Sequence, residues 1–138
     1  MSRMTFEKIF DRFLVYRKII DLAGADSIAN LAKIEADSCL IFTIDHDGSD
    51  FLKRKVEGEI DSKLKISILL LIAAFDKEYA LTRYRLGIDS KDPDFLFGEP
   101  YGWKNMNDDK FHLNTLNYYT GLRKNKAYKK CLKIWSTY

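Results

Sequence analysis

Two short clusters of acidic residues and histidine are the places in this sequence where side chains could bind a metal ion. One cluster lies in the run DHDGSD at positions 45–50, and the other lies in DDKFH at positions 108–112. Carboxylates and imidazoles are common ligands of Zn²⁺, and residues three apart on a helix can reach the same ion. A site built from both clusters would indicate a metal-dependent hydrolase, which we keep as a minor alternative. The candidate ligands are Asp45, His46, Asp47, Asp108, Asp109 and His112.

Each cluster also has a structural explanation. The first cluster does not match a calcium-binding loop that starts at Asp45. Asp50 stands where that loop requires glycine, and Val56 stands where it requires the bidentate glutamate. His46 and Asp47 match the His-Asp pair of the helical HD-type phosphohydrolases, but the upstream histidine of that pattern is missing. We therefore predict a solvated turn at 45–50, a helix N-cap at 108–109, and no metal or cofactor.

Other catalytic patterns are missing from the sequence. Neither Cys39 nor Cys131 has a histidine close by in the chain, and there is no G-x-S-x-G motif and no glycine-rich phosphate loop. Two distant cysteines without C-x-x-C spacing argue against a disulfide scaffold and favour a reduced, cytoplasmic setting. We expect a protein that is not an enzyme.

The C-terminal segment is strongly basic. Residues 121–138 contain six lysines and arginines and no acid, so the other 120 residues sum to −3. On a helix from about Asn125 to Trp135, the lysines share one face, and the opposite face is apolar. Such a face suits contacts with the phosphates of nucleic acid, although it equally suits plain solvation. The candidate nucleic-acid-binding residues are Arg123, Lys126, Lys129, Lys130 and Lys133.

A long connector at about 88–108 carries the opposite charge. Residues 89–109 hold six acids against two lysines, together with four aromatic residues and both prolines of the chain. A connector of this length is unusual in a compact domain unless it is functional or well packed. We expect the adjacent Phe95, Leu96 and Phe97 to be buried anchors. The candidate partner-binding residues are Asp92, Asp94, Glu99, Tyr101, Trp103, Asp108 and Asp109.

The elements that must position these residues all read as helices. A helix is predicted at about 6–22 with Thr5 as its cap and Gly24 as its stop, and a second begins at Asp26 or Ser27. The stretch 39–56 fits either a hairpin turning at Asp47-Gly48 or a helix, a loop and a short helix, which we favour. A central apolar helix is predicted at about 62–86. Two shorter helices follow at about 108–120 and 125–135, with Gly121 as the C-cap between them.

The composition fits one ordinary domain. A chain of 138 residues with 46% hydrophobic residues can build a real core, and 31% charged residues argue against disorder. We see no signal peptide and no apolar run long enough to span a membrane. The predicted fold is all-α: a compact bundle of five to six helices that forms a single domain over residues 1–138.

Two functional hypotheses follow. The first is a small protein-binding module that inhibits another protein stoichiometrically, as bacterial immunity proteins and phage antagonists do. Its acidic, aromatic connector would occlude a partner with a basic surface. The alternative is a nucleic-acid-binding regulator that uses the C-terminal lysine face.

Overall fold

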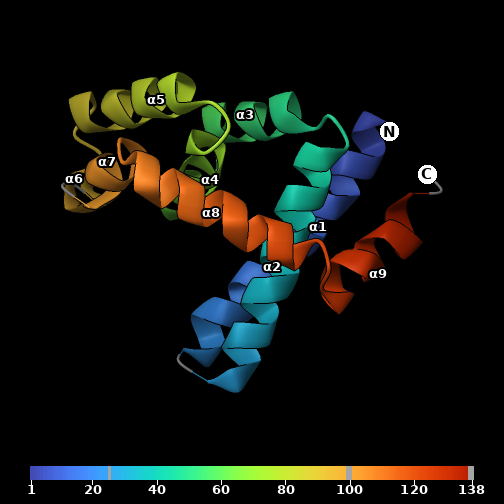
Figure 1. Ribbon diagram of the computed structural model, residues 1–138. Helices are drawn as coiled ribbons and strands as arrows, with labels where there is room; N and C mark the ends of the chain where they lie inside the picture. Colours follow the sequence, from blue (N-terminus) through green and yellow to red (C-terminus); the bar gives the residue numbers. More distant parts are fainter. Residues whose placement is uncertain (25, 99–100, 137–138) are drawn as a thin grey trace. The chain divides into compact units, whose positions relative to one another are not determined.

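The protein is described by a computed structural model that covers residues 1–24, 26–98 and 101–136; for residues 98 and 101–103 it describes the backbone alone (Figure 1). These residues form nine α-helices and no strand. The all-α prediction is confirmed, whereas the expected number of five to six helices is too low. Among the described helices, none combines the length and the apolar character that crossing a membrane requires.

The chain divides into two compact units. The first consists of residues 1–51 and 119–138, and the second of residues 52–118. This division could not be predicted from the sequence, because neither boundary lies in a linker: one falls inside α3 (Ser49–Glu57) and the other inside α8 (Asp109–Leu122). Whether the chain behaves as one folding domain, as we expected, stays a prediction.

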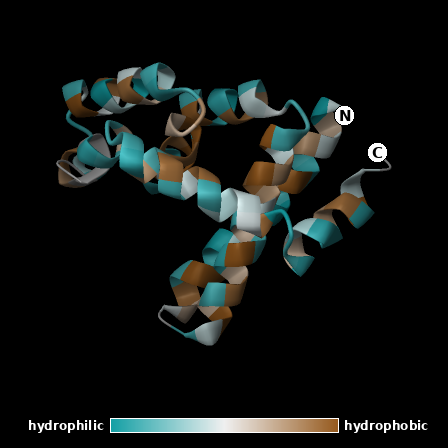
Figure 2. Cartoon of the chain, viewed as in Figure 1, coloured by the Kyte–Doolittle hydropathy of each residue, from teal (hydrophilic) through white to brown (hydrophobic). Residues whose placement is uncertain are grey.

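The first unit is built on a pair of long helices, α1 (Arg3–Ala23) and α2 (Ser27–Asp45). The Ser2 side chain caps α1 by accepting a hydrogen bond from the Thr5 backbone N–H, so the expectation that Thr5 is the cap is wrong. Gly24, with a φ of 64°, ends α1 as predicted. Both helices show hydrophobic residues interspersed with hydrophilic ones (Figure 2).

The core of this unit contains aromatic residues of α1, Phe51 of α3 and small residues of α2. Phe6 and Phe10 lie with their ring centroids 5.5 and 6.1 Å from that of Phe51. Alanines at a helical spacing are buried on α2, which allows the helices to approach closely. They are Ala29, Ala32 and Ala36.

The stretch at 39–56 forms a helix, a turn and a short helix, as we favoured. α2 runs to Asp45, and α3 begins at Ser49. The Gly48 N–H donates to the Thr43 carbonyl at 2.8 Å, and a Cβ on Gly48 would collide with the Thr43 side chain. Asp47 has a φ of 65°. The Asp-Gly pair therefore makes a tight link between helices and not a hairpin.

The second unit contains α4 (Ser62–Ala73) and α5 (Lys77–Asp89) in place of the single helix predicted at 62–86. The break lies at Ala74–Asp76, where the Asp76 side chain accepts a hydrogen bond from the Tyr79 N–H and caps α5. Burial is densest near the end of α4, at residues 68–73, whereas α5 buries Ala80 and Tyr84. An acidic N-cap thus outweighs the continuous helical periodicity of the sequence.

The connector at 88–108 is itself mostly helical, with α6 (Pro93–Gly98) and α7 (Tyr101–Met106). Phe95 is buried, and its ring lies 5.1 Å from that of Tyr84, whose hydroxyl donates to the Phe95 carbonyl at 3.1 Å. Met106 is fully buried. The described part of the connector is therefore anchored to the second unit at Phe95 and Met106 and is not an open loop.

The last two helices are α8 (Asp109–Leu122) and α9 (Lys126–Trp135). Gly121 lies inside α8, so the expectation that it caps the helix is wrong; α8 runs on to Leu122. Asn125 caps α9 by accepting from the Ala127 N–H at 2.9 Å.

Candidate functional site

The lysine face predicted from the sequence is formed by α9. The helix buries Ala127, Tyr128 and Cys131, and it packs on α2 in the first unit. Hydrophilic and hydrophobic residues alternate along it (Figure 2). The four predicted lysines are exposed, because they occupy the side of the helix away from the buried residues. They are Lys126, Lys129, Lys130 and Lys133.

Arg123 does not belong to this face. Its guanidinium donates two hydrogen bonds to the Asp45 carboxylate, from Nε at 2.8 Å and from Nη2 at 2.9 Å. The Tyr128 hydroxyl donates to the same carboxylate at 2.6 Å. A bidentate ion pair leaves little of the Arg123 charge for a partner, so our assignment of Arg123 as a nucleic-acid contact loses its support.

Burial and hydrogen bonding shift the pKa values within the cluster of Asp45, Arg123 and Tyr128. Burial acts to raise the pKa of Asp45, but the hydrogen bonds from Arg123 and Tyr128 outweigh it and hold the pKa below its ordinary value. Burial and the bond to Asp45 raise the pKa of Tyr128. At neutral pH the Asp45 carboxylate is therefore ionised and its two partners are protonated. This is the arrangement of a structural ion pair and not that of a general base.

Three of the four lysines have no carboxylate partner among the described residues. Lys130 lies 3.9 Å from Glu35, at the limit of an ion pair. For Lys126, Lys129 and Lys133, the described part of the chain offers no ion pair, and the sequence has no acid after Asp109. The positive charge of the lysine face of α9 (Lys126, Lys129, Lys130 and Lys133) is thus largely uncompensated.

The acids of the connector are mostly used inside the second unit. Asp92 accepts from the Ser62 hydroxyl at 2.6 Å and from the Asp94 N–H at 3.0 Å. Asp108 caps α8 by accepting from the N–H groups of Lys110 and Phe111, as one of our two explanations predicted. Asp109 pairs with Lys77 at 3.4 Å while its side chain stays 92% exposed.

Of the remaining predicted contact residues, Asp94 is half-buried. Glu99 lies outside the described residues, as do the side chains of Tyr101 and Trp103 on α7. The acidic surface that we predicted is therefore reduced, within the described residues, to Asp94 and the exposed Asp109.

Two hydrophobic side chains of α6 that we expected to be buried are exposed in the structure. Leu96 and Phe97 are 43% and 85% exposed, so only Phe95 of the three expected anchors is buried. The six-residue helix α6 explains this difference, because neighbouring residues on a helix point in different directions and cannot all face the core. Phe97 is the most exposed of the large hydrophobic side chains in the described chain.

The two predicted metal clusters do not form a site. His46 faces the Phe42 carbonyl through Nδ1 at 2.9 Å, and its ring stacks on Phe42. His112 is buried, with Nε2 only 2.6 Å from the Met106 carbonyl. Over the described ranges, no three histidine, cysteine, aspartate or glutamate side chains are placed to hold a metal ion. Both histidines are used in packing and backbone contacts.

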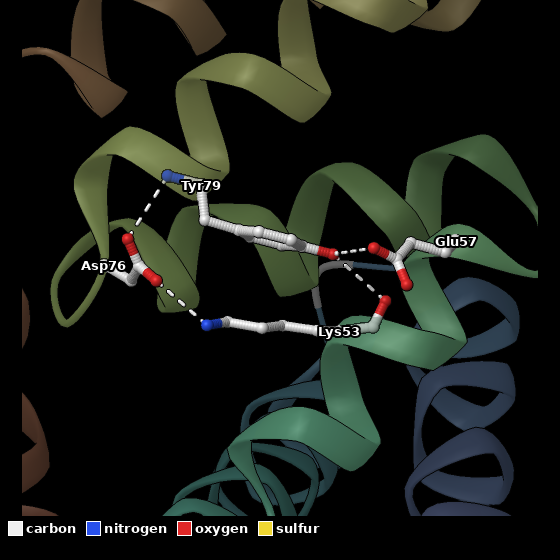
Figure 3. A network of polar contacts seen from close by, with 4 residues as sticks. All are labelled: Lys53, Glu57, Asp76 and Tyr79. Carbon is white, nitrogen blue, oxygen red and sulfur yellow. Dashed lines mark hydrogen bonds and ion pairs between the residues drawn. The ribbon is translucent and has the colours of Figure 1, made fainter.

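A polar network in the second unit was not predicted (Figure 3). Lys53 on α3 pairs with Asp76 at 2.9 Å, and its ammonium lies 4.8 Å from the centre of the Tyr79 ring. The Tyr79 hydroxyl faces both the Glu57 carboxylate, at 3.1 Å, and the Lys53 carbonyl, at 3.2 Å. Arg83 completes the network by pairing with Glu57. The acid at position 76, directly after the apolar run of α4, was the signal that could have revealed it.

The charges of this network cancel. Glu57 and Asp76 are balanced by Lys53 and Arg83, and the hydrogen bond from Arg83 lowers the pKa of Glu57. A cavity of about 190 Å³ opens beside it. Its lining residues include Glu57, Lys65, Arg83, Ser90, Asp92 and Phe95. Because Lys53 pairs with Asp76 and Arg83 with Glu57, we interpret the network as a structural link between α3 and α5.

The comparisons with known proteins identify no relative of this chain: no family model, no curated protein and no solved structure matches it.

Proposed function

We propose that this protein works by non-covalent binding and that the lysine face of α9 contacts the phosphate backbone of a nucleic acid. The observation that carries this proposal is the set of exposed lysines at 126, 129 and 133, which have no ion pair within the described residues. Their helix is held from the other side by buried residues and is capped by Asn125. The charges therefore lie along one side of a rigid element, as phosphate contacts require.

The composition of this face indicates what kind of binding to expect. It contains lysine only, and Arg123, the residue suited to bidentate base contacts, is paired with Asp45. Lysines attract phosphates as point charges and carry little information about the base sequence. The proposed activity is thus weak, salt-sensitive binding with little sequence preference.

The test measures binding of the full chain to fluorescently labelled DNA duplex and to single-stranded RNA while the salt concentration is raised. If about three phosphates are contacted, log K should fall against log[salt] with a slope of about −3 on duplex DNA. Combining Lys129→Glu with Lys133→Glu should weaken binding at low salt by about tenfold or more. Lys18→Glu combined with Lys63→Glu is the matched control, since both lysines are exposed and the net charge changes equally. Equal losses from the two pairs would contradict a specific role for α9.

The inhibitor hypothesis is kept as a second candidate because one observation favours it. Phe97 is 85% exposed on the acidic α6 segment, close in sequence to the half-buried Asp94. An exposed aromatic residue beside carboxylates is suited to anchoring a partner with a basic surface. This surface differs from the one proposed from the sequence, because it rests on Phe97 and not on Tyr101 or Trp103.

The second candidate is tested by recovery of a partner from lysate of the organism that encodes the protein. One protein should be retained in stoichiometric amount by the wild-type chain and lost when Phe97→Ala is combined with Asp94→Lys. Leu113→Ala is the matched hydrophobic control, because Leu113 is 58% exposed on a different helix. Recovery that survives the double change would exclude this surface.

A further inference from the structure

The cavity of about 190 Å³ in the second unit combines buried apolar side chains with a charged rim. Val56, Leu69 and Phe95 line it and are only 4%, 0% and 4% exposed. The charged lining residues are more accessible, and the side chains of Glu57 and Arg83 are 37% and 34% exposed. Apolar surface in the depth and charge at the rim are the features of a site for a small amphipathic molecule.

One wall of the cavity is fixed by the chain between α5 and α6. The Asp92 N–H donates to the Gly87 carbonyl at 3.1 Å, and the Asp92 carboxylate accepts from the Ser62 hydroxyl at 2.6 Å. The Tyr84 hydroxyl donates to the Phe95 carbonyl at 3.1 Å. These bonds hold the wall against α4 and α5. The cavity is therefore preformed, and a ligand does not have to order its walls on binding.

Two charged groups at the rim have unused bonding capacity. The Lys65 ammonium belongs to a half-buried residue and forms no hydrogen bond or ion pair with the residues that the structure describes. The Glu57 carboxylate binds both Tyr79 and Arg83 through Oε1, which leaves Oε2 without a partner in the described chain. Both oxygens of Asp92, by contrast, already accept hydrogen bonds. A partly desolvated charge without a partner costs free energy, which a bound group of opposite charge offsets.

We infer that this cavity binds a free α-amino acid with an apolar side chain. The carboxylate of the ligand pairs with Lys65, and its ammonium donates to Oε2 of Glu57. Its side chain contacts the buried lining residues Val56, Leu69 and Phe95. The charged lining residues are two acids and two bases, which favours a zwitterion over a ligand with a net charge.

The volume of the cavity limits the size of this amino acid. An engineered cavity of about 150 Å³ takes up benzene, so a cavity of about 190 Å³ suits a molecule of about the size of leucine. This inference does not depend on nucleic-acid binding, because the cavity belongs to the second unit and the lysine face of α9 to the first.

The experiment titrates the ¹⁵N-labelled full chain with L-leucine and follows the backbone amide signals by NMR. The expected result is saturable binding with a Kd of about 1 mM or lower and the largest shifts at the residues that line the cavity. Isocaproate lacks the amine of leucine and leucinamide lacks its carboxylate, so each should bind about tenfold more weakly. Absence of saturable shifts with leucine, valine and phenylalanine would overturn the inference. Equal affinity for leucine and isocaproate would overturn the assignment to an amino acid.

Substitution of Lys65 tests the contact with the ligand carboxylate. Lys65→Gln should raise the Kd for leucine about tenfold and leave the Kd for leucinamide unchanged, because leucinamide has no carboxylate. Lys63→Gln is the matched control, since Lys63 is exposed on the same helix and does not line the cavity. Equal losses in the two variants would contradict the role of Lys65. The comparison of leucine with its analogues uses the wild-type chain, so the inference stays testable even if Lys65→Gln fails to fold.

Discussion

The Asp45 carboxylate accepts two hydrogen bonds from the Arg123 guanidinium, at 2.8 and 2.9 Å, across 78 residues of sequence. This pair connects the end of α2 to the short segment between α8 and α9. It therefore helps to hold in place the helix that carries the exposed lysines. The same contact removes from the proposed binding surface the one arginine that the sequence had placed there.

Arg123→Ala should lower the free energy of unfolding by about 1–2 kcal/mol, because it leaves the Asp45 carboxylate, on a side chain that is 22% exposed, with a single partner. Urea-induced unfolding followed by circular dichroism measures this change. Lys77→Met is the control: it breaks a 3.4 Å pair with the exposed Asp109 and should cost less than about 0.5 kcal/mol. Equal costs would mean that the Asp45–Arg123 pair is no more than a surface contact.

The contribution of Asp45 should depend on pH. Its pKa in the folded protein lies below the ordinary value of 3.8, so the folded state favours the ionised form. The stability that Asp45 contributes is therefore fully present above about pH 5 and is lost as the pH falls through the folded pKa. Unfolding free energies of the wild type and Asp45→Asn should converge between about pH 5 and pH 2. A constant difference over this range would show that the carboxylate charge is not involved.

Tyr79 should ionise late in an alkaline titration. Burial, followed by the hydrogen bond to Glu57, raises the pKa of Tyr79 to about 12. Because its pKa is about 10 in an unfolded chain, its contribution to stability is present below pH 10 and is lost as the pH rises through about 12. The tyrosinate absorbance of Tyr79→Phe should lack one ionisation at the alkaline end. Loss of an ionisation near pH 10 would contradict the contacts in Figure 3.

The break between α4 and α5 should depend on the Asp76 side chain. Asp76→Ala removes both the cap of α5 and the partner of Lys53 and should cost about 1–2 kcal/mol. Asp76→Asn keeps an acceptor for the Tyr79 N–H and should cost less, since only the charge is lost. Thermal unfolding of the two variants separates the capping contribution from the ionic one. If both variants unfold like the wild type, the cap does not determine the break.

Two glycines inside helices should respond in opposite ways to alanine. A Cβ on Gly87 would lie 2.4 Å from the Phe95 ring, so Gly87→Ala should destabilise the protein by about 1–3 kcal/mol. On Gly121 in α8 a Cβ meets nothing within 4 Å, so Gly121→Ala should stabilise by about 0.5–1 kcal/mol. Urea unfolding of both variants checks the signs. A neutral Gly87→Ala would mean that α6 moves away from α5 without cost.

The parts of the fold that could be predicted are those with a strong local signal. Apolar periodicity with a glycine stop located α1, and Asp-Gly between two helical patterns marked the turn after α2. The break after Ala73 was missed because the apolar period continues through it, and only a capping side chain interrupts the helix. A capping side chain is a signal from one residue, so it is easily missed when the apolar periodicity of the sequence continues past it.

For the candidate site, the exposed lysines could be predicted from the sequence, but the ion pair of Arg123 with Asp45 could not. A helical wheel sorts residues within one helix, so Lys126, Lys129 and Lys133 could be placed on one face. The pairing of Arg123 with Asp45 and the burial of Cys39 and Cys131 are tertiary. Neither can be read from a single sequence, because both depend on how α9 lies on α2.

The first unit is assembled from the two ends of the chain, residues 1–51 and 119–138, whereas the second is continuous. On the ribosome, Asp45 and Cys39 are thus made long before Arg123 and Cys131, and all of residues 52–118 emerge in between. The second unit has its full set of residues earlier, so it can fold while the first still exposes the surface of α2 that α9 will cover. In a nascent chain, completion of the first unit has to wait for residues 119–138 to be translated.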